Sequence, residues 1–103
     1  MAMPQSHLAV FTISVAADLA GMQIQNLRVY ERRGLIEPAR TSGGTRRYSS
    51  ADVECLVRIR ELLEEGLNLA GIERVLELEQ EVRDLRRRVS EASEASAGPL
   101  RNA

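Results

Sequence analysis

Arginine and amide side chains mark the part of the chain that could do chemistry. All 14 basic residues are arginines, and six of them fall between residues 28 and 47, where Glu31 and Glu37 are the two acids. The six are Arg28, Arg32, Arg33, Arg40, Arg46 and Arg47. After residue 60 ten acids face six arginines, so the net charge of −1 hides a basic front and an acidic rear. Because guanidinium groups bind phosphate and guanine edges with two donors, the basic segment predicts a nucleic-acid partner. A genome whose base composition favours arginine codons would also explain why every basic residue is arginine.

A short helix is expected to present these groups. The periodicity of residues 23–33 is that of a helix that stops at Gly34, where glycine can take the left-handed conformation. Ile24, Leu27 and Tyr30 fall on the side that should face the core. An exposed face of amide and guanidinium groups suits base edges and phosphates. That face carries Gln25, Arg28, Val29 and Arg32.

The preceding segment predicts the first half of a helix-turn-helix. Residues 1–9 are expected to be a disordered lead-in, followed by a very short strand or extended entry. Its alternating apolar residues are Phe11, Ile13 and Val15. Ser14 is placed to cap a short alanine-rich helix that begins at Val15 and ends at Gly21. Two short helices joined by a turn with glycine make a helix-turn-helix, and the small residues allow another helix to cross closely.

A hairpin and a third helix should follow. Pro38 ends the helical tendency, and Gly43-Gly44 is a two-residue hairpin signal, with arginines on the return strand. Ser49 and Asp52 match a capping box before a helix that Gly66 ends. The broad buried face expected for this helix comprises Val53, Leu56, Val57, Ile59, Leu62 and Leu63.

The rear of the chain has the pattern of a coiled coil. Apolar residues recur at alternating steps of three and four, with valine at a and leucine at d, which is typical of a two-stranded seam. The seam residues are Val75, Leu78, Val82, Leu85 and Val89. Acids precede arginines along this helix, so antiparallel pairing would set each acidic half against the partner's basic half, and an antiparallel homodimer is predicted. From about Ser90 a frayed end and a flexible tail are expected.

These patterns give a domain plan and exclude several function classes. A winged helix-turn-helix is expected at residues 10–70, a dimerisation helix at 71–90 and a tail at 91–103. Cys55 is the single cysteine and His7 the single histidine, so neither an intramolecular disulfide nor a metal site is expected. No cofactor motif, nucleophile with a base or phosphate loop is recognisable, which argues against an enzyme. The chain also lacks a signal peptide or membrane-span pattern, so a cytoplasmic protein without membrane contact is expected.

At residues 27–49 the sequence LRVYERRGLIEPARTSGGTRRYS resembles the MerR-type regulators, with a pattern close to L-R-x-Y-x-x-x-G-L, then P-x-R and a G-x-R-x-Y wing. The resemblance covers residues 11–90, and ISVAADLAGM and GLNLAGI are most similar to the family's heat-shock repressors. It implies a mainly α, winged helix-turn-helix fold with a coiled-coil dimerisation helix. It also implies a homodimer that binds double-stranded DNA at an inverted repeat, represses a stress or chaperone operon and takes a DnaK-type chaperone as co-regulator.

The resemblance assigns roles to matching positions. Arg28 and Tyr30 would contact DNA from the recognition helix, where Arg32 shares the exposed face. The residues nearest the bases would be Gln23, Gln25 and Asn26, and those of the wing against the backbone would be Arg46, Arg47 and Tyr48. Val29 and Thr45 depart from the pattern, because many relatives have aromatic residues there, and the chain lacks a large sensor domain. Two alternatives remain: activation by DNA distortion, and a coiled-coil adaptor that does not bind DNA.

Overall fold

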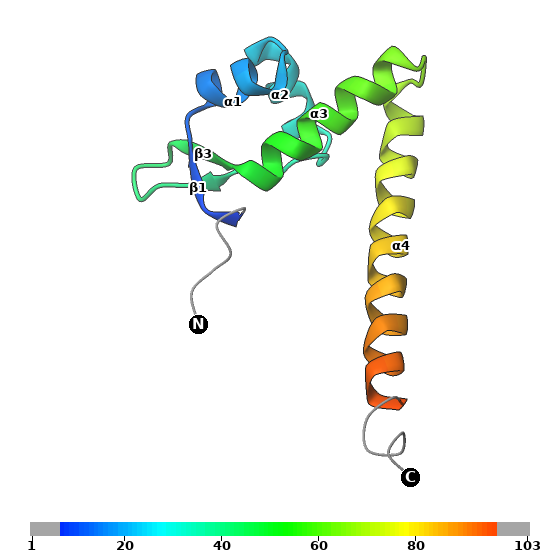
Figure 1. The fold of residues 1–103 in the computed structure, drawn as a ribbon. Coiled ribbons are helices and arrows are strands. Elements are labelled where there is room, and N and C mark those ends of the chain that lie inside the picture. The colour runs from blue at the N-terminus through cyan, green and yellow to red at the C-terminus, as the bar shows by residue number, and fades with distance from the viewer. Residues whose placement is uncertain (1–6, 97–103) are drawn as a thin grey trace. The chain divides into compact units, whose positions relative to one another are not determined.

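The computed structural model describes residues 7–96, and within them a small sheet is combined with four helices. The elements in order are β1 (Ala9–Phe11), α1 (Ile13–Ala20), α2 (Ile24–Arg32), β2 (Ala39–Arg40), β3 (Arg46–Ser49), α3 (Ser50–Glu64) and α4 (Leu69–Ser96) (Figure 1). The chain divides into two units, Met1–Asn68 and Leu69–Ala103. The mainly α class expected from the sequence is confirmed.

The first unit is held together by helices that cross at alanine. Ala16, Ala17 and Ala20 of α1 are at most 2% exposed, and α1 packs on both α2 and α3. Small side chains let helix backbones approach closely, so larger aliphatic groups from the neighbouring elements can fill the remaining core. Those groups are Leu27, Ile36, Leu56, Ile59 and Leu62. Leu63, expected on the buried face of α3, is instead 39% exposed.

The start of the first unit differs from the prediction. β1 covers Ala9–Phe11 and pairs with β3, so the strand begins inside the expected lead-in and ends before Ile13. Thr12 rather than Ser14 caps α1, because the Thr12 Oγ1 accepts a hydrogen bond from the Val15 amide at 3.3 Å. Thr12 and Ser14 both have hydroxyl groups that can cap a helix. Because β1 and its pairing with β3 end at Phe11, Thr12 is the residue that directly precedes α1. Residues 1–6 lie outside the described part of the chain.

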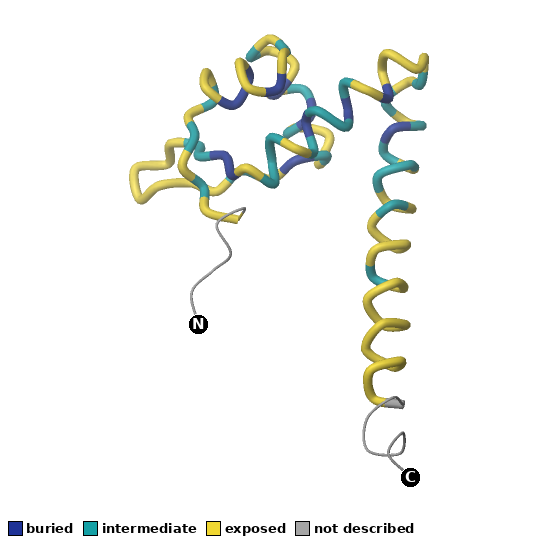
Figure 2. Tube along the Cα trace, in the orientation of Figure 1, coloured by how far each residue is buried: buried dark blue, intermediate teal, exposed yellow. Residues whose placement is uncertain are grey.

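The wing is the hairpin of β2 and β3, within a sheet of order β1-β3-β2. Ala39 pairs with Arg47 and Arg40 with Arg46, both antiparallel. The loop is longer than the predicted two residues: the Thr41 amide donates to the Thr45 carbonyl at 2.8 Å, and the Gly44 amide to the Thr41 carbonyl at 2.9 Å. Gly44 alone of the glycine pair has a positive φ, +85°, as a turn followed by a left-handed residue requires. The loop projects from the unit and is exposed (Figures 1 and 2).

The predicted helix boundaries around the wing are confirmed. α2 ends at Arg32, with Arg33 as its C-cap residue, and the φ of +77° at the following Gly34 allows the Leu35 amide to donate to the Tyr30 carbonyl at 2.9 Å. α3 begins with the expected capping box, in which the Asp52 amide donates to Ser49 Oγ at 3.0 Å and the Ser49 amide to Asp52 Oδ2 at 2.9 Å. These two caps fix where the wing segment leaves α2 and enters α3.

The second unit is described through its helix α4, which spans 28 residues. The helix continues past Ser90, where a frayed end was predicted, to Ser96. Glutamate and alanine in this stretch favour a helix even without apolar packing, and Arg87 Nε lies 3.7 Å from Glu91 Oε1 one turn later. Most of α4 is exposed (Figure 2), and residues 97–103 of the expected tail lie outside the described part of the chain.

Candidate nucleic-acid interface

The exposed face of α2 carries the polar residues singled out by the sequence. Gln25, Arg28 and Arg32 are exposed, while Leu27 is fully buried on the other side of the helix. Ile24 and Val29 are half-buried at the boundary between the two faces. The predicted division of this helix into a core side and a polar side is therefore confirmed.

The N-terminal end of α2 is also open to solvent. Gln23 is the N-cap residue in an extended conformation, and its side chain makes no capping hydrogen bond. Gln23 and Asn26 are both exposed, next to Gln25. Three amide side chains thus cluster at the end of the helix that follows the turn. Each amide can donate and accept hydrogen bonds at once, which is the pattern that an adenine edge offers in the major groove.

Arg28 and Arg32 are held by nothing in the described part of the chain. Within residues 7–96 no hydrogen bond or ion pair engages either guanidinium. Because Arg28 and Arg32 are four residues apart, they lie on one face of α2 and project together. Two unpaired positive charges on one face form a surface that attracts an anion.

The wing arginines are not equivalent. Arg47 is half-buried, and its Nη1 donates to the carbonyl of Arg46 at 3.1 Å. Arg46, which the resemblance assigned to the DNA backbone, instead directs its Nε to Glu31 Oε1 of α2 at 2.5 Å. Arg40 reaches the other oxygen of Glu31, with Nη2 3.2 Å from Oε2. Arg46 is therefore engaged within the fold, because Glu31 of α2 lies beside it.

Tyr30 and Tyr48 belong to the core. Tyr30 is 4% exposed and Tyr48 is fully buried. The Tyr48 hydroxyl is shielded from solvent and has no hydrogen-bond partner within residues 7–96, so it cannot touch a DNA backbone outside. Burial raises the pKa of both phenols, and for Tyr48 the charge of Glu31 raises the pKa further. The assignment of Tyr48 as a DNA contact is corrected on this ground.

Glu31 and Arg40 are the residues that the sequence reasoning missed. Glu31 counted only as one of two acids in a basic segment, and Arg40 only as one of six arginines. The sequence did contain a signal for this ion pair. A two-strand hairpin over 39–47 makes Arg40 and Arg46 neighbours, and two adjacent positive charges favour an acid nearby. That acid could not be placed before the fold was known.

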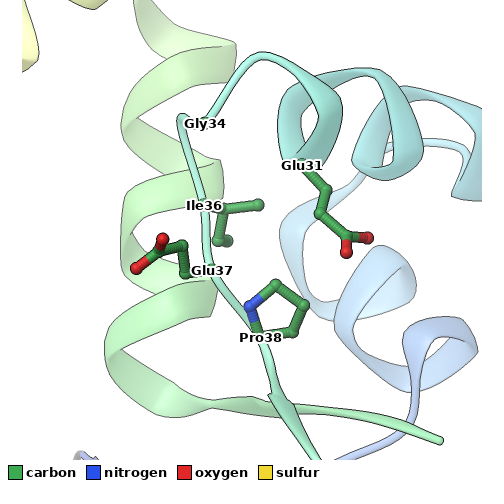
Figure 3. Close-up of a pocket in the computed structure, with 5 residues that line it drawn as sticks. All are labelled: Glu31, Gly34, Ile36, Glu37 and Pro38. Atoms are coloured by element: carbon green, nitrogen blue, oxygen red, sulfur yellow. The ribbon is translucent and has the colours of Figure 1, made fainter. Parts of the chain in front are cut away.

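A shallow depression of about 450 Å³ lies beside Glu31. Its lining residues are Glu31, Gly34, Ile36, Glu37 and Pro38. Figure 3 shows that the Glu37 carboxylate points away from that of Glu31, so the two acids do not converge on one ligand. Among the described residues there is also no group of His, Cys, Asp and Glu that could hold a metal ion. In residues 7–96 no helix combines the length and apolar character that crossing a membrane requires.

The seam residues of α4 form an uncovered apolar stripe. Val75 is half-buried, and the exposed fractions of the others rise along the helix. They are 42% for Leu78, 42% for Val82, 55% for Leu85 and 65% for Val89. Large aliphatic groups exposed at regular spacing on one side of a helix favour burial against a partner.

The comparison with known families decides the class of the protein. Residues 11–79, more than half of the chain, match the family described as "MerR HTH family regulatory protein". The chain belongs to the MerR HTH family. MerR family proteins are transcription regulators, so the expectation that this chain is not an enzyme is confirmed.

Two relatives show where the chain lies within the MerR family. A Streptomyces coelicolor protein that carries the name heat shock protein HspR is 49% identical over 90 residues, covering 86% of this chain and 60% of the relative. The HTH-type transcriptional regulator GlnR of Bacillus cereus is 36% identical over 92 residues, covering 89% of this chain and 71% of the relative. The match thus spans less than two thirds of the Streptomyces protein. The similarity to heat-shock repressors inferred from the sequence agrees with this relative.

Solved structures support the MerR fold. A transcription regulator from Ralstonia metallidurans, solved in complex with lead(II), matches with a TM-score of 0.65 at 27% identity, over 90% of this chain and 79% of that one. HiNmlR, a MerR family regulator lacking the sensor domain and solved on promoter DNA, matches with a TM-score of 0.63 at 24% identity. The latter match covers 89% of this chain and 76% of that one, and it shows the shared fold alone.

Proposed function

We propose that this chain is a sequence-specific DNA-binding transcription regulator that acts as a homodimer on an inverted-repeat operator. The observation that supports it best is the exposed α2 face, where Arg28 and Arg32 have no partner within residues 7–96. A helix that follows a tight turn and carries such a face is suited to the major groove. Membership of the MerR family, whose matched relatives are named as HTH-type transcriptional regulators, supports the same function.

The contacts fall into two kinds. The amides of Gln23, Gln25 and Asn26 would read base edges, because they lie at the exposed N-terminal end of α2. Arg28 and Arg32 would bind phosphates or guanine, and the wing would lie on the flanking backbone. Phosphate contacts would supply most of the affinity, so binding should weaken steeply as salt is raised.

Repression of a stress or chaperone operon is the regulatory role that we propose. The support is the 49% identity to the Streptomyces protein named heat shock protein HspR. A DnaK-type chaperone would be the co-regulator. Adding a purified DnaK-type chaperone to the regulator on its operator should change the fraction of DNA bound, whereas an unrelated protein of similar size should not. Equal binding with both additions would exclude this partner.

Helix α4 would form the dimer. The stripe from Val75 to Val89 is more than 40% exposed at four of its five positions, and a second copy can cover it. An antiparallel pair in which a positions face d positions would set Leu78 against Val89, and Val82 against Leu85. Homodimers bind inverted repeats because the two-fold symmetry of the protein matches that of the DNA.

The charges beside the seam suit this register. Glu79 of one copy would lie near Arg86 of the other, and Glu81 near Arg88, with each pair formed twice. A parallel pair would also bring opposite charges together, since Arg74 would face Glu79 and Glu81 would face Arg86. The antiparallel orientation is proposed because it sets the whole acidic half against the whole basic half. The two orientations place the seam residues differently and can be separated by cross-linking.

Disulfide cross-linking in a Cys55→Ser background distinguishes the orientations. In the antiparallel pair the two copies of residue 75 lie about 25 Å apart along the axis, at about 1.5 Å per residue, far beyond the reach of a disulfide. Val75→Cys should therefore give no cross-linked dimer, while a mixture of Leu78→Cys and Val89→Cys proteins should cross-link. Rapid cross-linking of Val75→Cys with itself would show a parallel pair instead.

Titration of DNA at two salt concentrations tests the proposed function. Arg28→Ala and Arg32→Ala should each weaken binding to an inverted-repeat duplex and lower the dependence of log K on log salt by about 0.9. Glu37→Ala is the matched control, because Glu37 is exposed and lies outside the α2 face. If neither arginine substitution changes affinity while the fold persists by circular dichroism, the assigned face is wrong. Absence of any sequence-selective binding by the unaltered protein would favour the adaptor alternative.

A further inference from the structure

A carboxylate on the recognition helix clasps both strands of the wing. Glu31, in the last turn of α2, has its side chain 19% exposed and accepts from Arg46 Nε at 2.5 Å and from Arg40 Nη2 at 3.2 Å. Its partners lie 9 and 15 residues further along the chain. Each of its two oxygens thus binds a different wing strand. We call Glu31, Arg40 and Arg46 together the clasp, which fixes the wing relative to the helix.

The Glu31 carboxylate offsets the repulsion between two arginines that the hairpin register places opposite each other. Arg40 and Arg46 are directly paired across β2 and β3, so their side chains lie on the same face of the sheet. Like charges directly opposite each other destabilise a strand pair, unless an opposite charge is placed between them. Glu31 is that charge. Arg40 extends the link into the turn, because its Nη1 also donates to the Gly44 carbonyl at 3.0 Å.

The clasp divides the arginines of the basic segment into two groups. Arg40 and Arg46 are neutralised in part by Glu31, whereas Arg28 and Arg32 have no partner within residues 7–96. An arginine that already binds a carboxylate gains less from a phosphate, because the phosphate must compete with the acid. The acid on α2 therefore controls how much positive charge the wing offers to DNA and where it lies.

We propose that Glu31 is a specificity-determining positioning residue: it holds the wing at a fixed place beside the recognition helix and withholds two arginines from indiscriminate phosphate binding. This inference rests on the proposed DNA-binding function. Without Glu31 the wing loses its attachment and Arg40 and Arg46 become available to any duplex. Affinity for arbitrary DNA should then rise while preference for the operator falls.

Glu31→Gln tests the proposal, with Glu37→Gln as its matched control. Both changes remove one negative charge, but the Glu37 carboxylate has no hydrogen bond or ion pair within residues 7–96 and points away from Glu31 (Figure 3). Affinities for an inverted-repeat operator and for a scrambled duplex are measured at two salt concentrations. Glu31→Gln should lower the ratio of the two affinities about tenfold and steepen the salt dependence by about 0.9 for each arginine released. Equal behaviour of the two variants would overturn the proposal.

Arg46→Ala separates a clasp from a direct phosphate contact. If Arg46 acts through Glu31, its removal leaves the salt dependence of the unaltered protein unchanged but reduces that of the Glu31→Gln variant by about 0.9. A direct phosphate contact would instead give the same reduction in both backgrounds, and this result would overturn the proposal. Failure of the unaltered protein to prefer an operator would count against the proposed function and not against the clasp.

Hydrogen exchange tests the clasp without DNA. The amides of Thr41 and Gly44 are bonded within the wing, so their exchange reports how firmly the hairpin is held. Exchange should accelerate in Glu31→Gln and stay unchanged in Glu37→Gln. If Glu31→Gln does not fold, Arg46→Gln removes the arm of the clasp whose side chain bonds to Glu31 and not to the turn, and it should accelerate the same amides. Unchanged exchange in a folded variant would refute the clasp.

Discussion

Replacing Tyr48 by phenylalanine should stabilise the protein. The ring is fully buried, and its hydroxyl is shielded from solvent with no hydrogen-bond partner within residues 7–96. A buried polar group without a partner costs about 1–3 kcal/mol, so Tyr48→Phe should raise the free energy of unfolding by about 1 kcal/mol. For a domain of this size that corresponds to about 4–8 °C in the melting temperature. Thermal unfolding followed by circular dichroism, at one fixed protein concentration because a dimer is expected, measures the change.

Tyr30→Phe is the matched control for that change. Tyr30 is also buried, but its hydroxyl is not among the shielded atoms without a partner, so its removal should leave stability nearly unchanged. A loss of about 1 kcal/mol or more in the free energy of unfolding of Tyr48→Phe would contradict this expectation, because it would mean that the hydroxyl has a partner. The salt dependence of DNA binding should not change in Tyr48→Phe, since a core residue contacts no phosphate.

The buried phenol also makes stability depend on alkaline pH. Burial raises the pKa of Tyr48 above its usual value of 10.0, so the folded state holds the proton more tightly than the unfolded state. The resulting stability is fully present below about pH 10 and is lost as the pH rises through the folded-state pKa. Urea unfolding at pH 8 and at pH 10.5 should show a larger loss of stability for the unaltered protein than for Tyr48→Phe. An equal loss in both would contradict the cause assigned to the shift.

Three further substitutions test the dimer and the two ends of the wing segment. Leu85→Ala removes a side chain that is 55% exposed in one copy and occurs twice in the dimer. Dimerisation should therefore weaken by about 2 kcal/mol, or about 30-fold in the dissociation constant, as measured by sedimentation equilibrium. Gln80→Ala, at the position farthest from the seam, is the control and should not weaken dimerisation. Ser49→Ala breaks the capping box of α3 and should cost about 1 kcal/mol in urea unfolding, and a cost near zero would show that the cap is dispensable. Gly34→Ala forces a side chain into φ +77° where no atom lies within 4 Å, so it should cost about 1 kcal/mol through backbone strain alone, and an unchanged stability would contradict the left-handed assignment.

Local signals in the sequence were enough to predict most of the fold. The capping box at Ser49 and Asp52 and the glycine that ends α2 depend on neighbouring residues alone, and the structure has both where they were predicted. The polar face of α2 was predicted for the same reason, because helical periodicity divides Arg28 from Leu27 whatever surrounds the helix. The family pattern added the wing and its place in the chain.

The predictions that the structure corrects concern features that depend on contacts between residues far apart in the sequence. Thr12 caps α1 because pairing with β3 ends at Phe11, and no property of Ser14 reveals this. Tyr48 matches a family position, but its burial depends on packing between the sheet and the helices. The engagement of Arg46 depends on Glu31, which lies 15 residues earlier. The orientation of the α4 pair stays a prediction, because it depends on two chains and the sequence of one chain supports it only through charge.

Selection of bound sequences from a pool of random duplex DNA tests whether the exposed face of α2 reads DNA. We expect the full chain to enrich an inverted repeat with half-sites about one helical turn apart, or a multiple of it, and Arg28→Ala to fail to enrich it under the same conditions. Retention of duplexes without any shared sequence, or equal enrichment by Arg28→Ala, would contradict the claim that the exposed face of α2 reads DNA.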